Sequence, residues 1–160
     1  MTEVKITPST LGDAVELSVL MREEDRAEVA AAVGWDAEEA TRRGLADSVE
    51  CWTMRAEDDL LAMYGVVDLG GKIGLGWLLS ADAVEENARA FWLACKRELP
   101  ALLERWDVLY NAIDCRHAKA LRWAEHLGFE LFEPELYGAL GIPFRPFIVR
   151  KEGVLCALQR

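Results

Sequence analysis

The chain has 160 residues, of which 52% are apolar and 29% charged, and this composition predicts one folded domain over residues 1–160 rather than a disordered segment. The 18 Lys and Arg against 28 Asp and Glu give a net charge of −10, which argues against nucleic acid or an anionic membrane as the partner. The first ten residues show no secretory signal and no apolar stretch is long enough to span a bilayer, so we expect a cytoplasmic protein.

The N-terminal part predicts one short strand and two helices. Val4–Ile6 alternates in polarity and precedes a Thr-Pro-Ser-Thr turn, which favours a strand followed by a helix cap. Leu11–Val33 has an apolar face and an acidic face, which predicts a single helix ending at Gly34. Asp36 is placed to cap a second helix that ends near Asp47.

Three extended segments with tight connections follow. They are Cys51–Arg55, Leu60–Asp68 and Ile73–Leu79, separated by the turns at residues 57–59 and 70–72. Short strands joined in this way form an antiparallel meander.

The rest of the chain alternates helices with strands. Apolar residues recur at helical spacing over Asp82–Trp106, and Pro100 should kink this helix or break it near Leu99. The segments after it read as strand, helix, strand and strand, at Val108–Ile113, Ala118–Leu127, Phe129–Phe132 and Phe144–Arg150. The order β-α-α-β-β-β-α-β-α-β-β predicts an α/β fold with a mixed, partly antiparallel sheet of about seven strands flanked by helices.

This order, together with one local motif, resembles the GNAT superfamily of acyl-CoA N-acyltransferases. The motif consists of the strand Leu109–Ile113 and the helical segment Ala120–Phe129, which closes on Leu-Gly-Phe. The resemblance implies a GNAT-like sheet that splays between its fourth and fifth strands, where Gly74 and Gly76 could serve the splay or a bulge.

Three segments are also similar to a group of GNAT-like phage and prophage proteins that includes the small internal virion protein of T7-like phages. The segments are Asn111–Phe129, Met21–Arg26 and Gly141–Arg145. This likeness implies a virion-associated role, in which binding to a protein partner or self-association takes the place of catalysis.

The sequence departs from the family at the diphosphate loop. The family uses a Gly-rich loop before the helix that follows the fourth strand, because glycine lets backbone N–H groups approach the anion. The corresponding segment here, Ser80–Asn87, has no glycine and contains Asp82, Glu85 and Glu86. Three carboxylates beside a diphosphate would repel it, so the sequence predicts a degenerate site and no cofactor.

The proton donors and acceptors of the family are also missing. Its general-acid tyrosine falls on Ala124, and its asparagine at the start of the same helix falls on His117. The fourth strand has no ionisable side chain that could serve as general base. Asp68, at the end of the third strand, and His117 are therefore the candidate catalytic residues, although an Asp at a strand end more often serves a turn.

If acetyl-CoA or CoA does bind, the resemblance implies a set of contacts on the fourth strand and beyond it. The candidate cofactor-binding residues are Leu78, Leu79, Ser80, Asn87, Asn111 and His117.

The polar run Asp114–His117 and Trp35 allow further interpretations. Cys115 and His117 suggest a thiolate nucleophile or two metal ligands, but no second pair has suitable spacing, and we predict no metal site. Structural roles are favoured: Asp114 capping the next helix, Arg116 in an ion pair and His117 hydrogen-bonded. Trp35 follows Gly34 and is expected to be exposed in a loop.

The sequence thus favours a non-catalytic GNAT-like protein with a phage-associated binding role. The alternative is an acetyl-CoA-dependent N-acetyltransferase with a non-standard diphosphate loop. A third possibility is an acidic inhibitor of a basic protein, suggested by the concentration of acids in the N-terminal helices.

Overall fold

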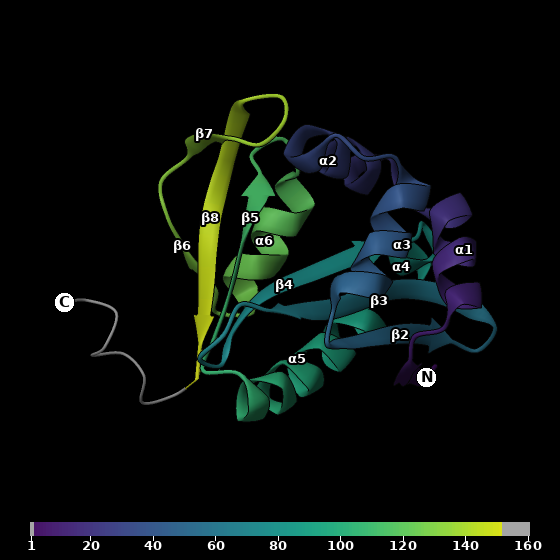
Figure 1. Cartoon of the computed structure of the whole chain (residues 1–160). Coiled ribbons are helices and arrows are strands. Elements are labelled where there is room, and N and C mark those ends of the chain that lie inside the picture. Colours follow the sequence, from purple (N-terminus) through teal and green to yellow (C-terminus); the bar gives the residue numbers. More distant parts are fainter. Residues whose placement is uncertain (1, 152–160) are drawn as a thin grey trace.

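One mixed sheet organises the described part of the chain, residues 2–151 of a computed structural model (Figure 1). Its strands are β1 (Val4–Pro8), β2 (Glu50–Ala56), β3 (Asp59–Asp68), β4 (Ile73–Ser80), β5 (Val108–Asp114), β6 (Glu130–Leu131), β7 (Glu135–Tyr137) and β8 (Ile142–Arg150). The helices are α1 (Leu11–Leu20), α2 (Glu23–Val33), α3 (Ala37–Asp47), α4 (Ala83–Glu86), α5 (Ala88–Arg105) and α6 (Ala118–His126).

The strands follow the order β1-β2-β3-β4-β5-β8-β6, and β7 also pairs with β8. Within residues 2–151 every pair is antiparallel apart from β4 with β5, which is parallel. The predicted mixed α/β fold is confirmed. The sequence missed β7, because three consecutive exposed residues carry no alternation that would mark a strand.

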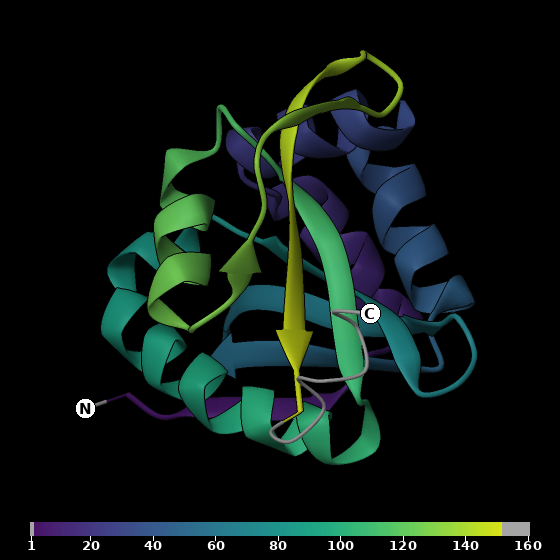
Figure 2. The same ribbon diagram turned by 90° about the vertical axis from the view of Figure 1, so that its left-hand side faces the viewer.

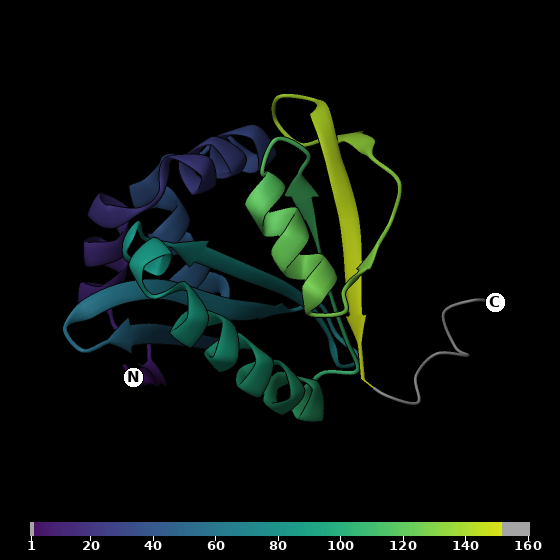
Figure 3. The same ribbon diagram turned by 180° about the vertical axis from the view of Figure 1, so that it is seen from behind.

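Helices cover both faces of the sheet, as Figures 2 and 3 show. Residues of α5 and α6 pack on one face and form the larger core with β3, β5 and β8, represented by Phe91, Ala124 and Phe147. Residues of α1 and α3 form a second core on the other face, represented by Leu17 and Ala40. The alternation of side chains along β3 and β4 supplies both cores from the same strands.

The predicted helix over Leu11–Val33 is two helices, α1 and α2, and its single span was wrong. Met21 is extended, with φ −56° and ψ 135°, and forms a bridge with Ala81. The backbone N–H of Arg22 donates to the carbonyl of Ser80 at 2.9 Å. The chain leaves the helix because these groups pair with the end of β4, a tertiary contact that helical periodicity does not reveal.

The predicted helix over Asp82–Trp106 starts as the single turn α4 and continues as α5. Asn87 separates the two, and its side-chain amide donates to the carbonyl of Ala83 at 2.9 Å. Pro100 lies inside α5, so the predicted break near Leu99 does not occur. Pro100 is exposed, which lets water hydrate the carbonyl that proline leaves without an N–H donor.

β4 and β5 pair over three residues, Ile73–Leu75 with Val108–Tyr110, and then diverge. Figure 1 shows the two halves of the sheet meeting at one end and opening toward α2 and α6. The splay expected between the fourth and fifth strands is therefore present, and we call it the fork. Glycine at position 74 permits the close packing at the paired end of the fork, because a Cβ at this position would lie 2.3 Å from Cγ1 of Val66.

Cys51, Cys95 and Cys115 are free thiols, and Cys156 lies outside the described residues. Among residues 2–151, no helix has the length and apolar content needed to cross a membrane. The same residues contain no group of three or more His, Cys, Asp or Glu side chains placed to hold a metal ion.

Candidate functional site

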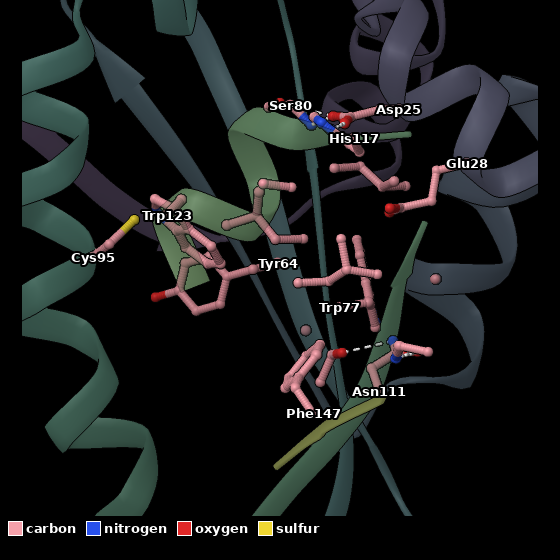
Figure 4. A pocket seen from close by; sticks show the side chains of 18 of the residues that line it. Asp25, Glu28, Tyr64, Trp77, Ser80, Cys95, Asn111, His117, Trp123 and Phe147 are labelled. Atoms are coloured by element: carbon pink, nitrogen blue, oxygen red, sulfur yellow. Dashed lines mark hydrogen bonds and ion pairs between the residues drawn. The ribbon is translucent and has the colours of Figure 1, made fainter. Parts of the chain in front are cut away.

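A cavity of about 860 Å³ occupies the fork and passes from one face of the sheet to the other (Figure 4). Its α2 end is lined by residues of α2, α3, β4 and β8, among them Glu28, Val29, Ala32, Trp35, Trp77 and Phe144. Its α6 end lies between α5 and α6 and is lined by Ala88, Trp92, Lys119, Ala120, Arg122 and His126. A space that crosses a sheet gives two ligands separate entrances to one meeting point.

The edge of β4 forms one wall of the cavity. The backbone N–H of Ala81 donates to the carbonyl of Leu61 in β3. In an antiparallel pair every second residue bonds to the neighbouring strand, so the N–H and C=O groups of Gly76, Leu78 and Ser80 point away from β3 and into the fork. The amide of Asn111 donates to the carbonyl of Gly76 at 2.8 Å and bridges the start of the fork. The edge groups of Leu78 lie beyond the last β5 pairing and have no strand partner among residues 2–151.

Asp25 joins three elements at the far end of the fork. Its Oδ2 accepts from the backbone N–H of Ser80 at 2.6 Å and from the Ser80 hydroxyl at 2.7 Å. Its Oδ1 lies 2.9 Å from Nε2 of His117. All three residues are buried, so the network fixes α2, the end of β4 and the start of α6 relative to one another.

His117 has a raised pKa in this network. Burial lowers the pKa of His117, but the hydrogen bond to Asp25 and the negative charge of Glu28 outweigh burial. His117 is thus the hydrogen-bonded polar residue that the sequence favoured, and it also lines the cavity.

Replacing Asp25 with Ala is expected to lower the free energy of unfolding by roughly 2–5 kcal/mol, because three buried groups lose their hydrogen-bond partner. Urea unfolding followed by far-UV circular dichroism measures this change. Glu23→Ala is the matched control, since Glu23 is exposed on the same helix and its loss should change stability by less than about 0.5 kcal/mol. Equal losses in the two variants would contradict the role assigned to Asp25.

Glu28 carries the carboxyl group best placed for proton transfer. Its Oε2 accepts from the backbone N–H of Asp114 at 3.0 Å, and Figure 4 shows its carboxylate pointing into the cavity. Burial raises the pKa of Glu28 to about 7, helped by the neighbouring carboxylates of Asp25 and Asp114 and opposed by the Asp114 N–H and the charge of His117. A carboxyl group with this pKa exchanges protons readily near neutral pH.

Trp77 and Trp35 give the α2 end flat apolar walls. The indole of Trp77 fits between Gly44 and Gly65, where an added Cβ would lie 2.8 Å and 2.9 Å from ring atoms, and its N–H donates to Ser48 at 2.8 Å. The guanidinium of Arg43 stacks 4.9 Å from the ring centre of Trp35. Trp35 is partly buried, so the expectation of an exposed loop residue was wrong.

The loop between β7 and β8 is bonded to the C-terminal end of α2. The backbone N–H groups of Ala139 and Leu140 donate to the carbonyls of Ala32 and Ala31 at 3.0 and 3.1 Å. These carbonyls belong to the last turn of α2, which has no following helical N–H donors. The loop therefore supplies hydrogen-bond donors to the last carbonyls of α2 and holds this helix, whose residues line the cavity, in place.

The α6 end is cationic at its mouth. Lys119, Arg122 and His126 lie on one side of α6, and Lys119 forms an ion pair with Glu85 at 2.7 Å. Arg22 pairs with the same carboxylate at 2.9 Å. The two cations lower the pKa of Glu85, the hydrogen bond from Lys119 acting most strongly.

The sequence predicted three carboxylates at the position of a diphosphate, and the structure places one of the three at the fork cavity. Of Asp82, Glu85 and Glu86, Glu85 alone is among the described residues that line the fork cavity, and two cations neutralise it. Asp82 lines a separate small pocket beside α1. Residue order cannot show how a single helical turn distributes its side chains between two surfaces.

The structure brings most of the predicted cofactor contacts together. Five of them line the cavity: Leu78, Leu79, Ser80, Asn111 and His117. Asn87 is not among the lining residues, and its side chain bonds to the preceding turn. Asp68 lies exposed at the end of β3, where it accepts from the N–H of Gly70 at 2.8 Å, and the fold does not bring it to the cavity.

The polar run at residues 114–117 has the structural roles that were favoured, with one difference. Arg116 pairs with Asp114 at 2.7 Å, as expected. Asp114 accepts from the backbone N–H of Arg116 and does not cap α6, whose N-cap residue is His117. Sequence reasoning missed Asp25 and Glu28, because both belong to an acidic helix whose charges all seemed solvated.

Comparisons with known proteins place this geometry in a fold. No family model and no curated protein matches the chain. The aminoglycoside N(6′)-acetyltransferase of Legionella pneumophila has a similar structure, with a TM-score of 0.71, 9% identity and coverage of 100% of this chain and 98% of that one. Spermidine N-acetyltransferase from Vibrio cholerae, solved with CoA and spermine, has a TM-score of 0.69, 12% identity and coverage of 96% and 98%. The chain therefore has the GNAT fold.

Proposed function

We propose that the protein is an acyl-CoA-dependent N-acyltransferase that joins its two substrates inside the fork. The proposal depends most on one observation: the cavity crosses the sheet, with a free strand edge along it and a carboxyl group of pKa about 7 at its α2 end. The fold alone does not assign an activity, since one fold supports many functions. The chemistry of the two ends supports this one.

The α6 end and the strand edge fit coenzyme A. Its pantetheine arm contains two amides, and the N–H and C=O groups of Leu78 can bind such an extended chain as a strand edge binds a peptide. Lys119 and Arg122 at the mouth are suited to the phosphates. Because Glu85 is paired with Arg22 and Lys119, it repels the phosphates less than a free carboxylate would.

The α2 end fits the amine. Bound acetyl-CoA would supply an activated thioester carbonyl at the meeting point of the two entrances. Glu28 accepts a proton from the substrate ammonium and leaves the neutral amine, which is the nucleophilic form. Apolar walls exclude water from the same space, so hydrolysis of the thioester is suppressed.

Calorimetric titration with CoA, followed by mass spectrometry of amines incubated with acetyl-CoA, tests the proposal. We expect CoA to bind the native chain, and Arg122→Glu to weaken binding by roughly tenfold because it reverses a charge at the phosphate end. Lys5→Glu makes the same charge change on β1, outside the cavity, and should leave the affinity unchanged. No binding at millimolar CoA would refute the proposal.

A non-catalytic CoA-binding protein is the second candidate. It is favoured by Ala124, which offers no proton to a departing thiolate where the family resemblance expects a tyrosine. CoA binding without transfer to any amine of a broad panel would support it. The phage-associated role and the protein partner or self-association expected from the sequence stay predictions, and the two similar structures above, both acetyltransferases, do not support a phage role.

A further inference from the structure

We infer that the amine substrate is a monoamine with a flat apolar body, such as an arylalkylamine, and not a polyamine or an amino sugar. This inference rests on the proposed function and concerns the chemistry of the α2 end. Two properties of that end lead to it: its charge and the shape of its walls.

A single buried carboxylate is available for a cationic substrate inside the α2 end. Among the described residues lining the cavity, Asp25 is saturated by Ser80 and His117, and Glu85 is paired with cations at the other end. Glu98 lies on α5, paired with Arg97. Asp47 is exposed to solvent at the end of α3. Glu28 is left to meet one ammonium group.

A second ammonium group buried in the α2 end would find no buried counter-charge, since Asp47 is exposed to solvent. Beyond Glu28 the walls consist of Val29, Ala32 and the aromatic rings, which cannot replace the hydration of a cation. Arg43 lies at the same end, held over Trp35 and paired with Glu39 at 2.5 Å, so it supplies no counter-charge to a second cation. Polyamines and aminoglycosides carry several such groups.

The aromatic walls of the α2 end favour a substrate that contains a ring. Trp77 lines the cavity in a position fixed by Gly44, Gly65 and the hydrogen bond to Ser48, so it needs no rearrangement to contact a planar group. Trp35 provides a second aromatic surface. Because an aromatic body desolvates both surfaces, binding gains from apolar contact while the ammonium stays near Glu28.

The test compares 2-phenylethylamine with spermidine as probes, by titration into the native chain saturated with CoA. We expect 2-phenylethylamine to bind at least tenfold more tightly, and Trp35→Ala to reduce that preference several-fold while Trp35→Phe retains it. Equal or tighter binding of spermidine, or binding of neither amine, overturns the inference.

The outcome is separable from that of the proposed function. If CoA does not bind, the proposed function fails, and the same two amines are titrated into the free chain to judge the α2 end alone. If both CoA and 2-phenylethylamine bind but mass spectrometry detects no acetylated amine, catalysis is refuted and the assignment of the amine class is supported.

Discussion

Replacing Glu28 with Gln is expected to reduce kcat/KM for acyl transfer by roughly 10²–10⁴-fold, the usual contribution of a positioned general base. The substitution keeps the size of the side chain and an oxygen that can accept from the N–H of Asp114. It removes the negative charge and, with it, the ability to take up a proton. Steady-state kinetics with acetyl-CoA and 2-phenylethylamine measures the loss, and the Kd for CoA should not change.

The pH profile supplies a second readout. Since Glu28 must be ionised to act and its pKa is about 7, kcat/KM of the native protein should fall as the pH drops through 7. The remaining activity of Glu28→Gln should lack this acidic limb. Glu23→Gln, an exposed change on the same helix, should keep both the rate and the limb. An unchanged profile in Glu28→Gln would exclude Glu28 as the base.

Stability separates loss of the base from loss of the fold. A carboxyl group whose pKa is higher in the folded state binds its proton more tightly there, so its ionisation makes the fold less stable as the pH rises from about 4.5 to 7. Gln has no charge to bury. Glu28→Gln should therefore be at least as stable as the native protein at pH 8, by up to roughly 1–3 kcal/mol.

The sequence revealed the fold more readily than the site, because the fold follows largely from local signals. Strand alternation, the turn glycines and the cap at Asp36 are local signals, and Asp36 does accept from the N–H of Glu39 at 2.8 Å. Likewise, the parallel pairing of β4 and β5 follows from an intervening helix. These features depend on neighbours in the sequence.

The site depends on contacts across long separations. Asp25 bonds to Ser80 and His117, which lie 55 and 92 positions away, and Glu28 bonds to a backbone group 86 positions away. In the sequence both acids look like the solvated face of a helix. Only the break at Met21, itself caused by a bridge to the end of β4, turns α2 so that these carboxylates enter the fork.

The loop between β7 and β8, which bonds to the end of α2, gives the second large expected effect. Gly138→Ala should lower the free energy of unfolding by roughly 2–4 kcal/mol, combining a left-handed backbone with a steric clash. Gly138 has φ +79°, and its Cβ would lie 2.6 Å and 2.7 Å from the carbonyl oxygens of Ala31 and Ala32. Because these are backbone atoms, the loop must move away and lose the hydrogen bonds from Ala139 and Leu140.

Gly141→Ala separates the two causes. Gly141 also has a left-handed backbone, with φ +60°, but no atom lies within 4 Å of its added Cβ. It should therefore cost only about 1–2 kcal/mol, the conformational part alone. Gly138→Ala should in addition raise KM for the amine and leave the Kd for CoA unchanged, because the loop holds α2, whose residues line the α2 end of the cavity. Equal unfolding energies for the two variants, measured in urea, would show that the contact with α2 is not what holds this loop.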